Sequence, residues 1–208
     1  MTLPHDASPT ATPTGNILDK YRVDHPIERR LVGTFLRALD ELLPAVAPTR
    51  ILEVGAGEGE ISERLRERFP DTSVVSIDLH DLALADEWRR RRVIGTFADI
   101  RRLPFPDDAF DLVLGIEVLE HVQGPEQALA EIRRVARDAV VLSVPREPIW
   151  RLANVLRGRY VRQLGNTPGH LNHWSKRGFR SLVSGTFEVG ATRTPFPWTI
   201  LSARRPPS

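Results

Sequence analysis

The stretch RILEVGAGEGE, from Arg50 to Glu60, decides the fold. Its first part, Ile51 to Val54, is mostly apolar and β-branched, which is typical of a strand buried on both faces of a parallel sheet. Behind the strand, apolar residues recur four positions apart, as on one face of a helix. Between the two lie three glycines at alternate positions: Gly55, Gly57 and Gly59. The stretch therefore predicts a strand, a glycine turn and a helix.

A glycine turn of this kind suits a nucleotide-like ligand. Glycine adopts positive φ and lets a ligand approach the main chain, and the following helix start offers N–H groups to a carboxylate or phosphate. The dinucleotide-binding fingerprint G-x-G-x-x-G does not fit, because Glu60 occupies the third-glycine position and Gly59 precedes it. Carboxylates at Glu58 and Glu60 would also repel a pyrophosphate. The plain alternative is a tight turn that binds no ligand.

Composition narrows the class of protein. The 208 residues suffice for one domain with a sizeable core, and they contain no run of eighteen apolar residues and no cysteine. No secretory signal is visible, so we expect a cytoplasmic protein. The pI of about 9.5 coexists with a formal charge of +2, because the only lysines are Lys20 and Lys176. The pI therefore gives little support for nucleic-acid binding, and we expect none.

Alternation of strands and helices predicts the architecture. We expect residues 1–18 to be a disordered tail and residues 19–208 to form a single domain. Helices are expected from Pro26 to before Pro44 and at 60–69, 81–92, 125–136, 146–158 and 176–184. Strands are expected at 51–54, 73–77, 93–97, 112–116, 139–144, 186–191 and 198–203. This order predicts a doubly wound α/β fold with a mostly parallel seven-stranded sheet and an antiparallel hairpin at its C-terminal end.

Acidic residues stand at or just beyond the ends of four predicted strands, at one edge of the sheet: Glu53, Asp78, Asp99 and Glu117. Asp78 lies about twenty residues beyond the glycine turn, where a second-strand carboxylate accepts hydrogen bonds from ribose hydroxyls. The alternative is that Asp78 caps the next helix, with Asp81 close by. Four consecutive arginines, Arg89 to Arg92, end that helix; they indicate a solvated helix end, with RNA contact as the sharper alternative.

Longer segments add a resemblance. The run E-x-G-x-G-x-G at residues 53–59, the segment ADIRRLPFPDDAFDLV at 98–113 and the segment EVLEHV at 117–122 resemble class I S-adenosylmethionine-dependent methyltransferases, in the small-molecule branch related to ubiquinone and menaquinone methylases. The resemblance spans Tyr21 to Ser202 and is specific for the cofactor but weak for the substrate.

This resemblance implies S-adenosylmethionine as the cofactor. Besides Glu53 and the three glycines, it implies that Asp78 and Leu79 lie at the ribose and that Glu117 lies beside the methionine part. Asp99 would accept a hydrogen bond from the adenine amino group, and the Ile100 N–H would serve a ring nitrogen. Four acids around a sulfonium and an ammonium group are electrostatically sensible.

The acceptor is expected to be a small molecule methylated at oxygen. The Asn/Asp-Pro-Pro-Tyr signature of nitrogen methylation is absent, and GIEV at 115–118 stands in its place. An alcohol or phenol needs a base that titrates near neutrality. The candidates are His170, His173 and His121, with His25 an outsider; for each, the alternative is a histidine bonded to backbone. No metal site is assigned.

Residues 146–174 form a long insertion that we expect to be a lid over the substrate. Its basic amphipathic helix carries Trp150 flanked by Arg146, Arg151 and Arg157. This helix either receives an acidic or lipid-linked acceptor, rests on an anionic membrane surface, or simply packs on the domain.

Two other functions stay open: a non-catalytic cofactor-binding or scaffold protein, and the disfavoured NAD-binding oxidoreductase. No oligomeric state is predicted.

Overall fold

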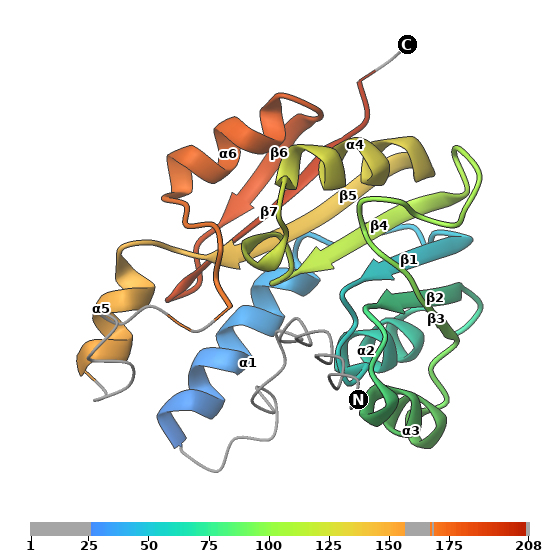
Figure 1. The fold of residues 1–208 in the computed structure, drawn as a ribbon, viewed down its shortest axis with the longest axis horizontal. Helices are drawn as coiled ribbons and strands as arrows, with labels where there is room; N and C mark the ends of the chain where they lie inside the picture. Colours follow the sequence, from blue (N-terminus) through green and yellow to red (C-terminus); the bar gives the residue numbers. More distant parts are fainter. Residues whose placement is uncertain (1–25, 157–166, 168, 207–208) are drawn as a thin grey trace, which may run out of the picture.

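The computed structural model describes residues 26–156, 167 and 169–206. Within them, seven strands form one sheet in the order β3-β2-β1-β4-β5-β7-β6 (Figure 1). The five from β3 to β5 in this order are parallel, and β7 pairs antiparallel with both β5 and β6. This confirms the doubly wound fold with its C-terminal hairpin. The strands are β1 (Arg50–Val54), β2 (Ser73–Asp78), β3 (Gly95–Phe97), β4 (Phe110–Ile116), β5 (Ala136–Pro145), β6 (Glu188–Arg193) and β7 (Trp198–Arg204).

Helices cover both faces of the sheet. Buried residues of α1 and α2 pack on one face, and buried residues of α4 and α6 pack on the other, which gives three layers. A short 3-10 helix, η1, follows β4 directly, and α5 follows β5. The bounds are α1 (Pro26–Asp40), α2 (Glu60–Arg68), α3 (Leu82–Arg91), η1 (Leu119–His121), α4 (Pro125–Val135), α5 (Ile149–Leu156) and α6 (Lys176–Ser184).

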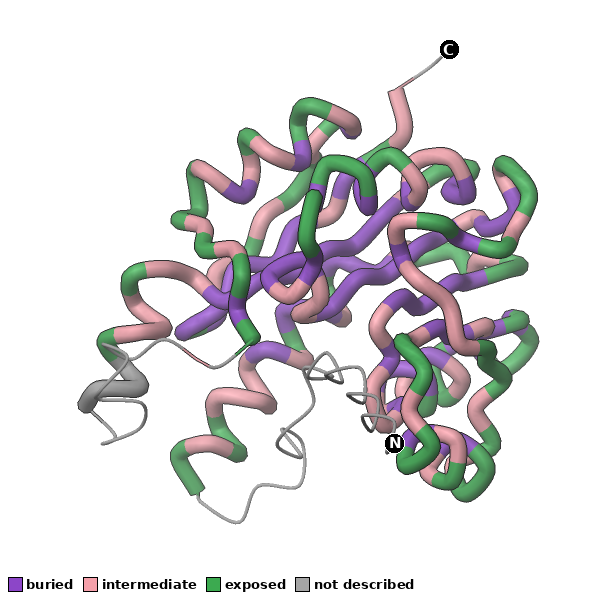
Figure 2. Tube along the Cα trace, in the orientation of Figure 1, coloured by how far each residue is buried: buried purple, intermediate pink, exposed green. Residues whose placement is uncertain are grey.

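The first strand shows why an apolar run without alternation belongs in the middle of this sheet. Ile51 packs in the apolar cluster beneath α1 and α2, while Leu52 and Val54 pack in the cluster beneath α4 and α6. All three side chains are completely buried, and the central strands form the buried band seen in Figure 2. Burial on both faces is the expected consequence of helices on both sides of a parallel sheet.

Several element boundaries differ from the prediction. Strand β3 begins at Gly95 and not at Val93, because the Val93 N–H donates to the carbonyl of Trp88 and so closes the end of α3. Helix α1 ends at Asp40, and its first turn leaves Ile27 64% exposed to solvent. Strand β5 begins at Ala136, directly after α4. Among the described residues, no helix has the length and apolar character to cross a membrane.

The topology creates one special edge of the sheet. Strand order reverses between β1 and β4, so the connections that leave these two neighbours run in opposite directions. In doubly wound folds the crevice at such a switch point, beyond the carboxyl ends of the strands, is where ligands bind. The glycine turn follows β1 here, and η1 follows β4.

Candidate functional site

The glycine turn after β1 has the backbone that its sequence predicts. Gly55, Gly57 and Gly59 have φ values of 69°, 52° and 91°, a region that suits glycine. The N–H groups of Gly55 and Ala56 both donate to the Ile77 carbonyl, at 2.8 and 3.0 Å, which attaches the turn to β2. A Cβ atom on Gly55 would lie 2.2 Å from Val118 Cγ2. The turn therefore needs glycine both for its conformation and for its contact with the segment after β4.

Asp78 joins the end of β2 to the glycine turn. Its Oδ2 accepts the Gly57 N–H and its Oδ1 accepts the Leu79 N–H, each at 2.7 Å. Burial raises the pKa of this carboxyl. The cap of α3 is Asp81, whose side chain accepts the Ala83 N–H, so the helix-cap interpretation of Asp78 is wrong. The acid and the turn predicted to serve one ligand do lie together.

Trp88 of α3 supports the turn from the other side, and sequence reasoning missed it. Its indole Nε1–H donates to the Gly57 carbonyl at 2.7 Å. The Gly57 N–H is bound by Asp78, so both the N–H and the carbonyl of Gly57 are hydrogen-bonded. The indole also stacks on Phe97, with ring centres 5.2 Å apart. A Cβ on Gly95 would lie 2.6 Å from the Trp88 ring. The glycine inside a short strand was the available signal, since such a glycine marks close approach of another group.

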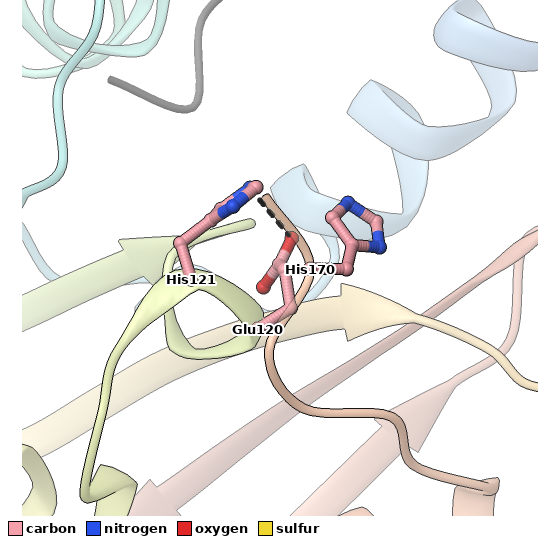
Figure 3. Close-up of side chains that lie close together, drawn as sticks. All are labelled: Glu120, His121 and His170. Atoms are coloured by element: carbon pink, nitrogen blue, oxygen red, sulfur yellow. Dashed lines mark ion pairs between the residues drawn. The ribbon is translucent and has the colours of Figure 1, made fainter. Parts of the chain in front are cut away.

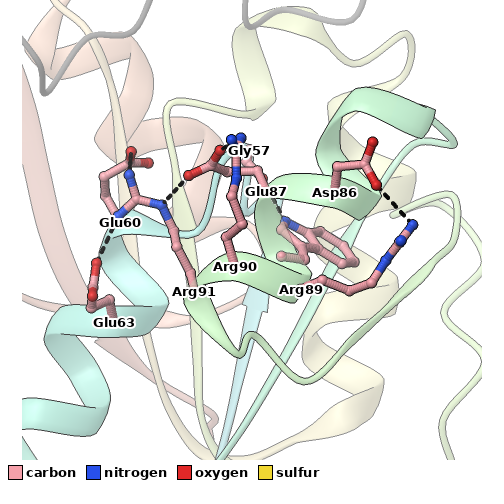
Figure 4. A network of polar contacts seen from close by, with 9 residues as sticks. Gly57, Glu60, Glu63, Asp86, Glu87, Arg89, Arg90 and Arg91 are labelled. Carbon is pink, nitrogen blue, oxygen red and sulfur yellow. Dashed lines mark hydrogen bonds and ion pairs between the residues drawn. The ribbon is translucent and has the colours of Figure 1, made fainter.

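The arginine run at the end of α3 divides into two kinds of residue (Figure 4). Arg89 and Arg90 are solvated, as predicted, and pair with Asp86 and Glu87 of their own helix. Arg91 is 14% exposed and binds Glu60 at 2.7 Å, Glu63 at 2.6 Å and Glu87 at 2.8 Å, so the solvated-face prediction is wrong for it. This network ties α3 to α2. Because Arg91 neutralises Glu60, Glu58 is the remaining carboxylate of the turn that would repel a pyrophosphate.

Glu53 is not one of the charged acids of the sheet edge. Its side chain is 2% exposed and accepts a hydrogen bond from Ser62 of α2, with Ser76 of β2 3.5 Å away. Burial raises the pKa of Glu53 to about 8. At neutral pH the carboxyl is therefore largely protonated, so Glu53 does not supply the charge that the four-acid prediction gave it, and the roles of the other three acids stay predictions. The Glu53 side chain lies between β1, α2 and β2.

Asp99 and Ile100 follow β3 at the same edge. Arg101 binds the Asp99 carboxylate with two guanidinium nitrogens, the shortest contact being 2.6 Å from Nη2, and lowers the pKa of that carboxyl. Ile100 is buried in the cluster beneath α4. The structure thus gives Asp99 a side-chain partner that the sequence interpretation did not include, and its role toward adenine stays a prediction.

Glu117 ends β4 in an unusual conformation. Its φ is 60°, in the left-handed region that costs a non-glycine residue about 1–2 kcal/mol. The Glu117 N–H donates to both the carbonyl and the hydroxyl of Ser143, at 3.2 and 3.1 Å, which holds the residue in place. Strained residues of this kind cluster at functional sites. Val118, which contacts the glycine turn, comes next.

Two of the three candidate histidines meet beside η1 (Figure 3). The rings of His121 and His170 are 4.9 Å apart, and His121 Nε2 lies 4.0 Å from Glu120 Oε1. Glu120 is 1% exposed and His170 is 8% exposed. His173 is exposed, with its ring 6.3 Å from that of His170. Sequence reasoning missed Glu120, although it directly precedes His121 just after a strand end.

The described parts of the insertion are attached to this cluster. The N–H groups of Leu171 and Asn172 donate to the Glu120 carbonyl, and the Asn172 side-chain amide donates to the carbonyls of Leu119 and Val122. Trp150 of α5 stacks on His170, and its Nε1–H donates to Thr167. Trp150, half-buried, thus packs on the domain, and the membrane-surface alternative for this helix stays a prediction. Residues 157–166 and 168, including Arg157, lie outside the described residues.

Comparison with known proteins adds family information. Residues 52–144 match the methyltransferase domain family. A malonyl-[acyl-carrier protein] O-methyltransferase of Geobacter sulfurreducens is 33% identical over 116 residues, 54% of this chain and 43% of the relative. A demethylmenaquinone methyltransferase of Thermus thermophilus is 35% identical over 136 residues, 62% of this chain and 61% of the relative. The chain therefore covers less than two thirds of either relative.

The fold also has solved counterparts. The crystal structure of an S-adenosylmethionine-dependent methyltransferase from Aquifex aeolicus superposes with a TM-score of 0.68 at 16% sequence identity. The superposition covers 88% of this chain and 94% of that protein. At this identity the likeness concerns the fold.

Proposed function

We propose, from the match of residues 52–144 to the methyltransferase domain family, that the protein transfers a methyl group from S-adenosylmethionine to an oxygen of a small-molecule acceptor. The observation that carries the proposal is the direct bond between the Asp78 carboxylate and the Gly57 N–H. It joins the acid that we propose binds the ribose to the glycine turn, beside the switch point of the sheet.

The residues at this edge fit the cofactor. Positive φ at three glycines gives a turn whose main chain a ligand can approach closely, and Asp78 has further oxygen lone pairs for ribose hydroxyls. Leu79 lies beside that carboxylate, and Asp99 with the Ile100 N–H is proposed to receive the adenine. Glu117 is proposed to bind the ammonium group of the methionine part. Glu53 is proposed to act indirectly, because its carboxyl is buried and bonded to Ser62 at the start of α2.

Chemistry at the methyl group needs mainly position and protection from water. When bound, S-adenosylmethionine would supply a methyl group on a sulfonium, whose carbon an acceptor oxygen could attack in line while the carbon–sulfur bond breaks and S-adenosylhomocysteine leaves. The glycine turn and the acids hold the position of the reactants, which can account for a large part of the rate. Residues 19–208 are proposed to form one domain. Within it, the insertion 146–174 is proposed as the lid that excludes water from the methyl-transfer site.

The acceptor side is proposed to be the face that carries His121, His170 and His173. These imidazoles can remove the proton of an acceptor hydroxyl or polarise its O–H bond. Their segments follow β4 and β5 at the cofactor edge. Oxygen as the accepting atom is supported by the relative that is named an O-methyltransferase. The second relative is named for demethylmenaquinone, so an acidic or a lipid-linked acceptor both stay within the proposal.

Calorimetry on an Asp78→Asn variant tests the cofactor site. The asparagine amide nitrogen cannot accept the hydrogen bonds that one carboxylate oxygen accepts, so affinity for S-adenosylmethionine should fall by about 1–3 kcal/mol. Asp86→Asn is the matched control, because Asp86 is an exposed acid that pairs with Arg89 of its own helix. Unchanged affinity in a folded Asp78→Asn protein would remove Asp78 from the site.

Binding and catalysis need separate measurements. Titration with NAD in place of S-adenosylmethionine discriminates the oxidoreductase alternative, since only one of the two should bind. Formation of S-adenosylhomocysteine in the presence of candidate acceptors, carboxylic acids and phenols first, then tests turnover. Binding without turnover on any acceptor would favour the non-catalytic alternative.

A further inference from the structure

Glu120, His121 and His170 form a compact group of metal-ligating side chains. One carboxylate oxygen and one imidazole nitrogen from each histidine lie within 4.8 Å of one another. Figure 3 shows η1 supplying Glu120 and His121 and the insertion supplying His170. Two distant parts of the chain thus bring three ligand atoms of different type to one point.

The orientation of His121 is that of a metal ligand. Its Nδ1 lies 2.9 Å from the Gly169 carbonyl oxygen, which can only accept, so Nδ1 is the donor in this contact. Nε2 is the atom that faces Glu120 Oε1, at 4.0 Å, which is beyond hydrogen-bond distance. An imidazole whose other nitrogen donates to a backbone carbonyl is the usual arrangement around protein-bound metals.

From this geometry we propose that Glu120, His121 and His170 bind one divalent transition-metal ion of the zinc class. Zinc lies about 2.0–2.1 Å from imidazole nitrogen and carboxylate oxygen, which places tetrahedral ligand atoms about 3.4 Å apart. The three atoms, which lie within 4.8 Å of one another, would move closer together to reach that spacing. Two imidazoles and one carboxylate are ligands that zinc, cobalt and iron accept, whereas magnesium and calcium prefer oxygen alone.

The backbone around the group is held in advance. The Glu120 carbonyl accepts the N–H groups of Leu171 (2.7 Å) and Asn172 (3.0 Å), directly after His170. The Asn172 side chain fastens the same segment to both ends of η1. Burial of Glu120 and His170 removes competing water, which strengthens attraction between a carboxylate and a cation. The site therefore binds without a large ordering cost.

Three protein ligands leave a coordination position open, as in catalytic zinc sites. A cation at that point would lower the pKa of an acceptor hydroxyl beside it, and the proton would pass to His173 or to solvent. This role toward the acceptor rests on the proposed methyl transfer, whereas binding of the ion does not. The proposal gives His121 and His170 the part of ligands, and not of free bases.

The test uses the whole chain without an affinity tag, treated with a chelator and then titrated with Co²⁺ alone. One equivalent should produce visible absorption bands of a four- or five-coordinate cobalt ion, and an equivalent of Zn²⁺ should abolish them. Thermal unfolding should shift upward with Zn²⁺ and not with millimolar Mg²⁺. Neither measurement needs the cofactor or an acceptor, so failure here and failure of the proposed function are distinguishable.

Variants locate the ion. His170→Ala and Glu120→Gln should each weaken Zn²⁺ binding more than about 100-fold, since loss of an outer partner alone costs 10–100-fold. His121→Gln is the variant of choice if the buried ones unfold, because the His121 side chain is 19% exposed. His80→Ala is the matched control: His80 packs on Phe97 of β3, three strands from β4 in the sheet.

The result can overturn the proposal in two ways. A wild-type protein that shows no cobalt bands and no calorimetric zinc binding at 100 micromolar ion leaves the histidines to act as bases directly. Zinc binding that His80→Ala weakens as much as His121→Gln would place the ion elsewhere.

Discussion

At the scale of single residues, Glu53 makes a prediction about pH. Its pKa is about 8 in the folded protein and near 4.5 when unfolded, so the folded state holds an extra proton between these values. The free energy of unfolding should therefore fall as pH rises from 4.5 to 8, by up to about 1.4 kcal/mol per pH unit. In Glu53→Gln this contribution disappears, and the variant should gain stability relative to the parent as pH rises.

Urea unfolding of both proteins at several pH values measures the difference. Glu126→Gln, which removes an exposed carboxylate of α4, controls for the loss of one negative charge. Parallel pH profiles for Glu53→Gln and the parent would show that Glu53 titrates normally in the folded state.

Gly55 gives a prediction about close contact. Alanine there would adopt a positive φ and place Cβ 2.2 Å from Val118. Gly124 also has a positive φ, but an added Cβ would meet nothing within 4 Å. Gly124→Ala should cost about 1–2 kcal/mol of stability from backbone strain alone, and Gly55→Ala about 1–3 kcal/mol more from the overlap.

Adding Val118→Ala to Gly55→Ala separates the two contributions, because it removes the overlapping methyl groups and leaves the strain. Urea unfolding of the single and double variants should show partial recovery. If Gly55→Ala costs no more than Gly124→Ala, the contact between the turn and Val118 does not constrain the fold.

At the scale of elements, α3 acts as a support for the glycine turn. Trp88→Phe should keep the stacking on Phe97 but lose the hydrogen bond to the Gly57 carbonyl. We expect about 1 kcal/mol weaker binding of S-adenosylmethionine, close to the typical net value of one hydrogen bond, with a smaller change in thermal stability. Isothermal calorimetry beside thermal unfolding measures both. A variant that loses stability but not affinity would make Trp88 a core residue only.

Elements were the part of the structure that sequence predicted best. Apolar periodicity placed the helices and strands, because helices on both sides of the sheet leave the central strands uniformly apolar. Boundaries were less predictable. Val93 is β-branched and suits a strand, yet its N–H is used by the end of α3. Such competition between neighbouring elements for one hydrogen bond leaves no periodic signal.

At the scale of the whole molecule, sequence predicted the contents of the site better than its contacts. Spacing brought Asp78 to the glycine turn, because strand ends of a parallel sheet share one edge. The sequence could not show that the Glu53 side chain is buried against Ser62. It also could not show that Arg91, unlike Arg89 and Arg90, binds Glu60 of another helix. Glu120 and His170 lie close together because the insertion docks beside η1, fifty residues earlier in the chain. No local sequence pattern predicts such a docking.

The insertion gives the prediction that involves the whole chain. Hydrogen exchange with and without S-adenosylhomocysteine should slow at the glycine turn and also within residues 146–174, if these residues close over the ligand. Strand β6, Glu188–Arg193, lies at the far edge of the sheet and should not change. Slowing at the turn alone would leave the insertion without a part in cofactor binding.

The position of β7 has a consequence for synthesis of the protein. Strand β5 ends at Pro145, but the neighbour that covers its second edge begins at Trp198, more than fifty residues later. On the ribosome, the apolar segment Val140–Leu142 therefore emerges with one edge unpaired, long before its partner exists. An unpaired apolar edge invites pairing with other chains. This strand is where a nascent-chain chaperone would have most to protect.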